Sequence, residues 1–260
     1  MFEKMRERWT KAINPLVHRM EGVDPSLLTW TSLILSILAF YLLMTAGNDT
    51  NGAILIVGGV VVILVAGVLD GLDGALARHQ GTDGPYGAFL DHTIDRVVDV
   101  GILVAIGMNA AFVDNVSSGF LAGLLTLFGS YMGTQAQSVG LDRIYGGFSR
   151  ADRMVLTLVA LVLAAWQAHW GVAGIEMSDL HWLGEWALLG NTELNGMTFA
   201  LGISAWGGVY TFLVRFVKTR NGLLACVGSR LSRKNACLTD IQWGNGYPLF
   251  NAPDFREAPN

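Results

Sequence analysis

Residues 68–99 read VLDGLDGALARHQGTDGPYGAFLDHTIDRVVD and place six aspartates next to strongly apolar sequence. Asp70 and Asp73 are three residues apart, and Asp91 and Asp95 are four residues apart. In a helix, side chains at these spacings project from the same face. The connection between the two pairs is short and contains glycine and proline, so it predicts two antiparallel, neighbouring helices. We therefore expect the two pairs of carboxylates to face each other.

The rest of the chain has the composition of a membrane protein. Of its 260 residues, 52% are hydrophobic and only 15% are charged, whereas soluble domains have about 25% charged residues. A helix needs about 20 apolar residues to span a bilayer. Six windows meet this requirement, at roughly 26–46, 53–76, 88–112, 118–139, 151–171 and 196–218. The sequence thus predicts an all-α polytopic membrane protein with six transmembrane helices, and its net charge of −4 argues against nucleic acid as a partner.

The segments that flank the six windows predict two further regions. From Phe2 to Met20, apolar residues recur at steps of three and four, while most basic residues fall elsewhere. This periodicity predicts that residues 1–22 form an amphipathic helix in the headgroup layer of the membrane, with a helix packed on protein as the alternative. We expect residues 23–218 to form the six-helix domain. Residues 219–260 lack a clear period and are interpreted as a cytoplasmic tail of unknown role.

The distribution of lysine and arginine predicts the orientation in the membrane. Basic residues occur before the first window, near Arg78, near Arg150 and after the last window. The alternate connections, near Asn48, near Asp114 and over 172–195, contain none. Loops rich in lysine and arginine stay on the cytoplasmic side. We therefore expect both termini and the aspartate-bearing helix ends on the cytoplasmic side of the plasma membrane.

Four carboxylates that converge at a membrane point to a function, because ionisable groups are costly there. They also repel one another and cannot all stay charged without cations. Carboxylate oxygens are hard ligands that suit Mg²⁺ or Mn²⁺. A plainer role, as a helix cap or an ion pair with Arg96, stays open for Asp99. The sequence therefore predicts a metal site formed by Asp70, Asp73, Asp91 and Asp95.

The aspartates belong to a longer pattern, Asp70-x-x-Asp73-Gly74-x-x-Ala77-Arg78, then eight residues, then Gly87-x-x-x-Asp91-x-x-x-Asp95. This pattern resembles, position for position, the signature of the CDP-alcohol phosphotransferase (CDP-alcohol phosphatidyltransferase) family. Six spans with the pattern across the second and third also match that family. The resemblance implies an enzyme of phospholipid biosynthesis. It would transfer the lipid phosphoryl group of a CDP-linked lipid, CDP-diacylglycerol or CDP-archaeol, to a polar alcohol and release CMP.

The same resemblance implies roles for individual residues. Asp70, Asp73 and Asp91 would bind two divalent cations, Mg²⁺ or Mn²⁺. Asp95 would complete this metal site and act as the general base. The family resemblance also implies a homodimer. The CDP-binding residues would be Asp70, Gly74, Ala77, Arg78 and Gly87.

A second segment indicates which alcohol accepts the lipid group. The sequence GGFSRADR at 146–153 is similar to the branch of the family that makes phosphoinositol phosphate or phosphoglycerol phosphate lipids. In that branch, basic residues bind the acceptor's own phosphate, which implies acceptor-binding roles for Arg150, Arg153 and Arg215. The sequence departs from the branch at 133–137, GTQAQ, where a lysine and an arginine are usual. Inositol phosphate or glycerol phosphate is the expected acceptor, and serine or free inositol is the alternative.

Two other classes of membrane protein also use intramembrane carboxylates. An ion-coupled transporter is disfavoured because the aspartates lie near one rim of the membrane and the sequence shows no inverted repeat. A membrane prenyltransferase also binds pyrophosphate through aspartates and Mg²⁺, but its aspartates usually form two separate clusters. Metal-dependent release of CMP from a CDP-lipid would distinguish the three classes.

Overall fold

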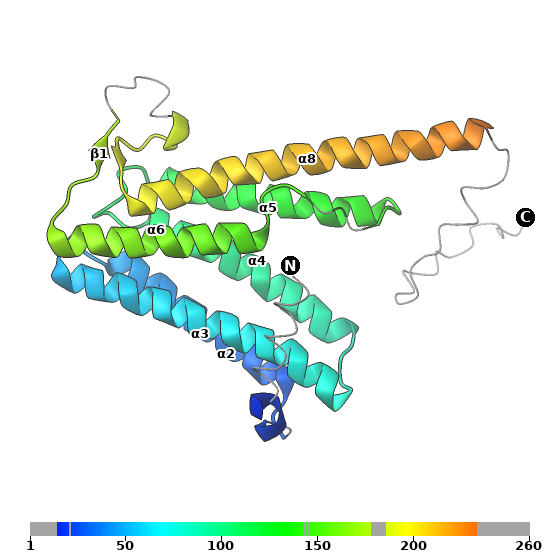
Figure 1. The fold of residues 1–260 in the computed structure, drawn as a ribbon, viewed down its shortest axis with the longest axis horizontal. Coiled ribbons are helices and arrows are strands. Elements are labelled where there is room, and N and C mark those ends of the chain that lie inside the picture. The colour runs from blue at the N-terminus through cyan, green and yellow to red at the C-terminus, as the bar shows by residue number, and fades with distance from the viewer. Residues whose placement is uncertain (1–14, 21, 143, 145, 178–185, 233–260) are drawn as a thin grey trace, which may run out of the picture.

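The computed structural model describes residues 15–20, 22–142, 144, 146–177 and 186–232, with side chains up to residue 225 (Figure 1). Within these residues, each of the six predicted windows overlaps a helix, and one short antiparallel hairpin joins the last two. The helices are α2 Pro25–Thr45, α3 Thr50–Gln80, α4 Pro85–Gly107, α5 Ser117–Ser138, α6 Arg150–Trp170 and α8 Gly196–Ser232. The hairpin strands are β1 Ile175–Glu176 and β2 Glu193–Leu194.

Local sequence signals determine where the helices near the aspartates begin and end. Asp24 caps α2 by accepting a hydrogen bond from the Ser26 N–H at 2.9 Å, and a proline occupies the start of the helix. Asp49 caps α3 in the same way through the Gly52 N–H, at 2.8 Å. α3 ends at Gly81, whose φ of 66° lies in the left-handed region that favours glycine. A short connection then leads into α4, so α3 and α4 run in opposite directions.

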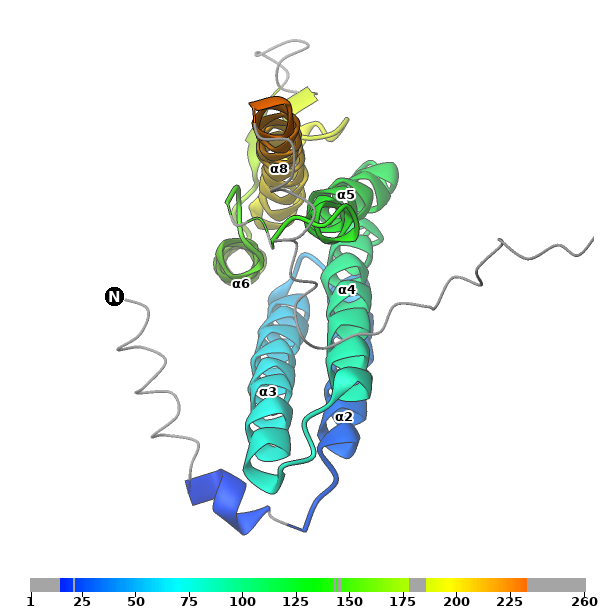
Figure 2. The same ribbon diagram turned by 90° about the vertical axis from the view of Figure 1, so that its right-hand side faces the viewer.

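The six helices pack in a closed ring in the order α2, α3, α6, α8, α5 and α4, with α4 returning to α2 (Figure 2). In this ring α2 lies between α3 and α4. The predicted antiparallel direction of α3 and α4 is therefore confirmed, but they are not the close neighbours that the short connection suggested. α2 packs on both of them. The end of α3 and the start of α4 can thus face a shared space beside α2 and α6.

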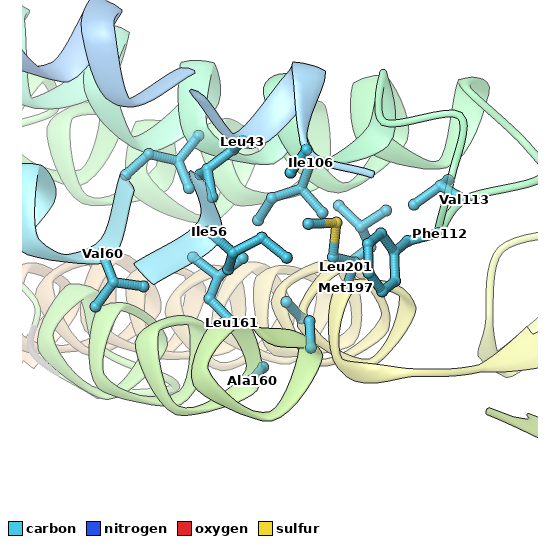
Figure 3. Packing of buried hydrophobic residues seen from close by; sticks show 14 of the residues in the cluster. Leu43, Ile56, Val60, Ile106, Phe112, Val113, Ala160, Leu161, Met197 and Leu201 are labelled. Carbon is cyan, nitrogen blue, oxygen red and sulfur yellow. The ribbon is translucent and has the colours of Figure 1, made fainter. Parts of the chain in front are cut away.

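The main hydrophobic core packs side chains from several helices against one another (Figure 3). It is formed where α2 ends, α3 begins, α4 ends, and α6 and α8 pack together. Its fully buried side chains include Leu43, Ile56, Ile106, Leu161, Met197 and Leu201. A smaller cluster at the aspartate-bearing end consists of Val17, Leu28, Leu72 and Leu76.

Four of the described helices are long and apolar enough to cross a membrane: α2, α3, α6 and the part of α8 from Gly196 to Ala225. The two others, α4 and α5, differ from these four in composition. α4 contains three aspartates and an arginine between 91 and 99. α5 has no charged residue but is rich in glycine, serine and threonine, which lowers its hydropathy. Six transmembrane helices therefore remain a prediction.

The ends of the chain differ in part from the sequence interpretation. α8 continues past the predicted end of the last window, at 218, to Ser232. The reason is that a hydropathy window detects only apolar sequence, whereas a helix can continue with polar residues. Of the predicted amphipathic helix, residues 15–19 are helical, and residues 1–14 lie outside the described residues. Most of the predicted tail, from 233 onwards, also lies outside them.

Candidate active site

The two halves of the sequence pattern lie on facing helices. Asp70 and Asp73 belong to the last third of α3, and Asp91 and Asp95 belong to the first half of α4. Asp73 and Asp95 are buried, and Asp70 and Asp91 are half-buried. All four lie close enough for their negative charges to repel one another. The structure thus brings together the four predicted metal ligands, although α2 separates the helices that bear them.

A small cavity borders this site. Asp70 of α3, Asp95 of α4 and Arg150 of α6 line it together. Two serines of α2, Ser32 and Ser36, add hydroxyl groups to its wall. Nη2 of Arg150 lies 2.7 Å from Oδ1 of Asp95. The site therefore lies where four helices meet, and the guanidinium group of Arg150, from α6, contacts one of the aspartates.

The donor atoms of this site fit a divalent cation. Oxygens of Asp91 and Asp95 and a ring nitrogen of His92 lie within 4.8 Å of one another. Oδ1 of buried Asp95 makes an ion pair with Nη2 of Arg150 at 2.7 Å. The two oxygens of a carboxylate offer further lone pairs, so Asp95 could bind a hard cation in addition to Arg150. His92 is exposed and was missed in the sequence, where only its place beside Asp91 could have indicated it.

A hydroxyl group on α2 holds one of the aspartates. Thr29 is buried, and its Oγ1 donates a hydrogen bond to Oδ2 of Asp73. Ser32 and Ser36, on the same face of α2, are also buried. The sequence signal is the spacing 29, 32 and 36, which puts three hydroxyl groups on one face of an apolar helix. It was missed because serine and threonine are common at interfaces between membrane helices.

Replacing Thr29 with valine should weaken metal binding without removing a metal ligand. Valine keeps the shape of the side chain but removes the hydroxyl group that donates to Asp73. Groups that orient a metal ligand typically contribute about 10- to 100-fold in affinity or activity, so we expect roughly tenfold more Mn²⁺ to be needed for half-maximal activity. Thr31→Val is the matched control, because the Thr31 hydroxyl donates only to the backbone carbonyl of Leu27. An equal Mn²⁺ requirement in both variants would show that Thr29 does not orient Asp73.

The predicted CDP-binding residues lie on the last turns of α3 and the first turn of α4. Gly74 and Ala77 are half-buried, and Arg78 and Gly87 are exposed. A Cβ atom at Gly74 would lie 3.4 Å from Nη1 of Arg78, so a larger side chain would press on this guanidinium group. A Cβ atom at Gly87 would meet nothing within 4 Å. The packing of the chain itself therefore does not require glycine at 87.

The loop before α6 explains how Arg150 reaches the aspartates. Gly147 has a φ of 88°, which favours glycine. The next residue, Phe148, donates its N–H to Oγ1 of Thr211 on α8 at 2.8 Å. Ser149 then forms a capping box at the start of α6. Because the loop is anchored on α8 and capped, Arg150 occupies the first position of α6 and faces α4.

The three predicted acceptor-binding arginines have different surroundings. The side chain of Arg150 is 36% exposed, and it contacts Asp95 and also Asp99, whose Oδ1 lies 3.0 Å from its Nε. Arg153 is buried, and its Nη2 lies 2.7 Å from Oδ2 of Asp99. Arg215 donates from Nη1 to a backbone carbonyl of α5 at 2.8 Å. The structure thus brings Arg150 to the aspartates, connects Arg153 to them through Asp99, and places Arg215 against α5.

The departure from the branch pattern at 133–137 has a structural counterpart. A Cβ atom at Gly133 would lie 3.1 Å from Nη1 of Arg215. The glycine therefore leaves room for a guanidinium group that comes from α8. The positive charge of Arg215 thus lies beside this part of α5, although α5 itself has no lysine or arginine.

Asp99 makes more contacts than the sequence indicated. Its ion pair with Arg96, which the sequence left open, is present at 3.3 Å. It also binds Arg150 and Arg153, which are 51 and 54 residues further along the chain. Such long-range pairs have no signal in a single sequence.

The helical ring and its aspartate site define a class of enzyme. The family model of CDP-alcohol phosphatidyltransferases matches residues 23–188, and the chain belongs to this family. It is an integral membrane enzyme of phospholipid biosynthesis, which uses a divalent metal to transfer the lipid phosphoryl group of a CDP-linked lipid to an alcohol. CMP is released. The family predicted from the sequence is confirmed, in preference to a transporter or a prenyltransferase.

Two relatives illustrate the branch of the family. The chain is 29% identical over 189 residues to the phosphatidylinositol phosphate synthase of Cutibacterium acnes. The aligned residues cover 68% of this chain and 88% of the relative. It is 33% identical over 149 residues to the archaetidylinositol phosphate synthase of Pyrococcus horikoshii. Here the aligned residues cover 55% of this chain and 72% of the relative.

Solved structures show the same fold. The phosphatidylinositol phosphate synthase of Mycobacterium tuberculosis with CDP-DAG bound superposes with a TM-score of 0.56 at 21% identity, covering 79% of this chain and 92% of that chain. The same enzyme in complex with manganese and citrate gives a TM-score of 0.58 at 20% identity, covering 79% and 87%. At this level of identity, the likeness establishes the fold.

Proposed function

We propose that the protein transfers the lipid phosphoryl group of a CDP-linked lipid to a hydroxyl group of a phosphorylated polyol, with inositol phosphate as the first choice and glycerol phosphate as the second. The observation that carries this proposal is the contact of Arg150 with Asp95. It places a group that can bind the phosphate of the acceptor beside the carboxylate that can take the proton of its hydroxyl group. The named relatives, which make inositol phosphate lipids, support it. Serine and free inositol are the alternative acceptors, and these would not need the guanidinium groups.

The aspartates divide the chemical tasks between them. Asp70, Asp73, Asp91 and Asp95 are the residues that would hold two divalent cations, Mg²⁺ or Mn²⁺. When bound, the cations would neutralise the pyrophosphate and make CMP a better leaving group. Asp95 is also the general base. Its carboxylate takes the proton of the acceptor hydroxyl as that oxygen attacks phosphorus and CMP leaves.

The nucleotide part of the donor is assigned to the surface beside the aspartates. Asp70, Gly74, Ala77, Arg78 and Gly87 form the proposed CDP site. Arg78 is exposed, and its forked guanidinium group can hold a phosphate with two hydrogen bonds. Open space at Gly87 lets the nucleotide approach the backbone of α4. The lipid tails stay in the bilayer throughout the reaction.

The acceptor is assigned to the start of α6, across the aspartates from the proposed CDP site. Arg150, Arg153 and Arg215 are the proposed acceptor-binding residues. Of these, Arg150 is best placed to touch the acceptor phosphate, because it is partly exposed and contacts the general base. Arg153 is buried, so it supports this site through Asp99.

A comparison of acceptors tests the proposal directly. Purified protein is given CDP-diacylglycerol or CDP-archaeol, with Mg²⁺ and one acceptor at a time, and CMP release is measured. We expect turnover with inositol phosphate that exceeds turnover with glycerol phosphate, inositol or serine. Turnover with serine or free inositol alone would refute a phosphorylated acceptor.

We further propose the arrangement of the chain in the membrane. α4 and α5 complete six transmembrane helices, and residues 23–218 form the catalytic domain. Residues 1–22 lie along the membrane surface as an amphipathic helix, and 219–260 form a cytoplasmic extension. Both termini and the active site face the cytoplasm, because the lysine and arginine residues gather at that end. Two chains associate as a homodimer.

Cysteine labelling tests the sidedness. Ala173 and Gly81 are both exposed and lie at opposite ends of the bundle. A cysteine at 173 should react with an impermeant maleimide on intact cells, and a cysteine at 81 should react only after permeabilisation. The opposite pattern of labelling would place the active site on the outer face.

A further inference from the structure

Asp99 is a buried charge to which the reaction proposed above gives no role. Its residue is only 3% exposed, and it lies one helical turn beyond Asp95 on α4. Its carboxylate contacts three guanidinium groups, those of Arg96 at 3.3 Å, Arg150 at 3.0 Å and Arg153 at 2.7 Å. A carboxylate so fully enclosed and so fully paired requires an explanation beyond helix capping.

The two oxygens of Asp99 have different partners. Oδ1 accepts a hydrogen bond from Nε of Arg150, and Oδ2 accepts hydrogen bonds from Nη2 of Arg153 and Nη1 of Arg96. A bond to Nε fixes the plane of a guanidinium group, because the group is rigid and planar. In this plane, Nη2 of Arg150 lies 2.7 Å from Asp95. Asp99 therefore sets the orientation in which Arg150 faces the proposed general base.

The donors of Arg150 are only partly used by these contacts. A guanidinium group has five N–H donors, and the contacts with Asp95 and Asp99 engage Nη2 and Nε. This leaves Nη1 as the donor group that could serve an acceptor phosphate while Asp95 and Asp99 hold the same side chain.

The charge balance of the cluster favours an anionic ligand. Three guanidinium groups surround Asp99, and Arg150 also pairs with Asp95, so the three arginines outnumber by one the two carboxylates that they contact. Buried cations need nearby anions or hydrogen-bond acceptors. Arg150 and Arg153 also lie in the first turn of α6, where the helix dipole favours negative charge. A phosphate group matches these conditions better than a neutral alcohol does.

We propose that Asp99 is a positioning residue for the acceptor. It holds Arg150, with buried Arg153 as a further partner, so that Arg150 binds the phosphate of a phosphorylated alcohol and the hydroxyl group of that alcohol is directed to Asp95. The proposal rests on the phosphorylated acceptor of the proposed function. It does not require Asp99 to touch either substrate.

Kinetics of Asp99→Asn and Asp99→Glu test this role. With inositol phosphate, Asp99→Asn should raise the acceptor KM by about 10- to 100-fold, the typical effect of a residue that orients a ligand-binding group. The KM for the CDP-lipid should change less than about twofold. Asp99→Glu keeps the charge but moves the carboxylate by one methylene group, so its acceptor KM should lie between those of the wild type and Asp99→Asn. Asp114→Asn, at the opposite end of the bundle, should match the wild type. An unchanged acceptor KM in both Asp99 variants would overturn the proposal.

A double-mutant cycle shows whether Asp99 acts through Arg150. If it does, adding Asp99→Asn to Arg150→Gln should lower kcat/KM for the acceptor far less than Asp99→Asn lowers it in the wild type. Losses that multiply would mean that the two residues act separately, which would overturn the positioning role. The unfolding temperature of each variant in detergent separates folding from function. If Asp99→Asn does not fold, Asp99→Glu, which keeps the buried charge paired, carries the test alone.

Failure of this inference differs from failure of the proposed function. If the wild type shows no turnover with inositol phosphate or glycerol phosphate, the proposed function fails and the inference fails with it. If the wild type turns over a phosphorylated acceptor but the Asp99 variants keep a normal acceptor KM, only the inference fails. Binding of inositol phosphate, followed as a rise in unfolding temperature, gives a second readout and should be lost in Asp99→Asn but kept in Asp114→Asn.

Discussion

Replacing Asp70 or Asp91 with asparagine should reduce CMP release by about a thousandfold or more. A catalytic cation stabilises the transition state by several kcal/mol, and about 4 kcal/mol corresponds to roughly a thousandfold in rate. Asparagine has nearly the same shape as aspartate but lacks the charge that a cation needs. The same loss should follow when a chelator removes divalent metal from the wild type, and Mg²⁺ or Mn²⁺ should restore it.

The matched control for this prediction is Asp114→Asn. Asp114 is exposed, lies at the opposite end of the bundle and contacts Thr192. It should retain normal activity and the normal response to metal. Full activity of Asp70→Asn or Asp91→Asn in the presence of the chelator would rule out the aspartate metal site.

The second large effect is expected at the arginines that start α6. Arg150→Ala should lower kcat/KM for inositol phosphate by about 10- to 100-fold, because a charge-assisted hydrogen bond typically contributes about 1.5–3 kcal/mol. Arg153→Ala should also lower it, because loss of Arg153 leaves Asp99 with one partner fewer. The KM for the CDP-lipid should stay within about twofold of the wild-type value in both variants.

Comparison of inositol phosphate with free inositol gives the contrast for this prediction. The phosphate-dependent part of the acceptor affinity should disappear in Arg150→Ala, so both acceptors should then react poorly and alike. Arg220→Ala, an exposed residue near the end of α8, should behave like the wild type. Equal small effects of Arg150→Ala on both acceptors would show that these arginines do not bind a phosphate.

The helices could be predicted because their signals are local. Apolar windows, the cap at Asp24, the proline at 25 and the glycine at 81 all act within a few residues of a helix end. The position of α2 between α3 and α4 could not be predicted, since it depends on which faces pack and not on the length of a connection. The extension of α8 was missed for a different reason, because apolar windows cannot detect a polar continuation of a helix.

The site was predictable to the extent that its chemistry follows a fixed spacing. The four aspartates lie within a pattern that a single sequence displays. Thr29 and Asp99 were not assigned a function, although both hold groups in the site. Thr29 reaches Asp73 across 44 residues, and Asp99 reaches Arg150 across 51. Contacts of this kind are made by packing, and the sequence does not show which residue is the partner.

The location of the main hydrophobic core gives the two ends of the bundle unequal resistance to local opening. Leu43, Ile56 and Leu161 are fully enclosed in the larger apolar cluster, whereas the end with the aspartates combines ion pairs and hydroxyl groups with a smaller apolar cluster. Amides near the core should therefore exchange their hydrogens slowly, and amides near Gly81 should exchange faster.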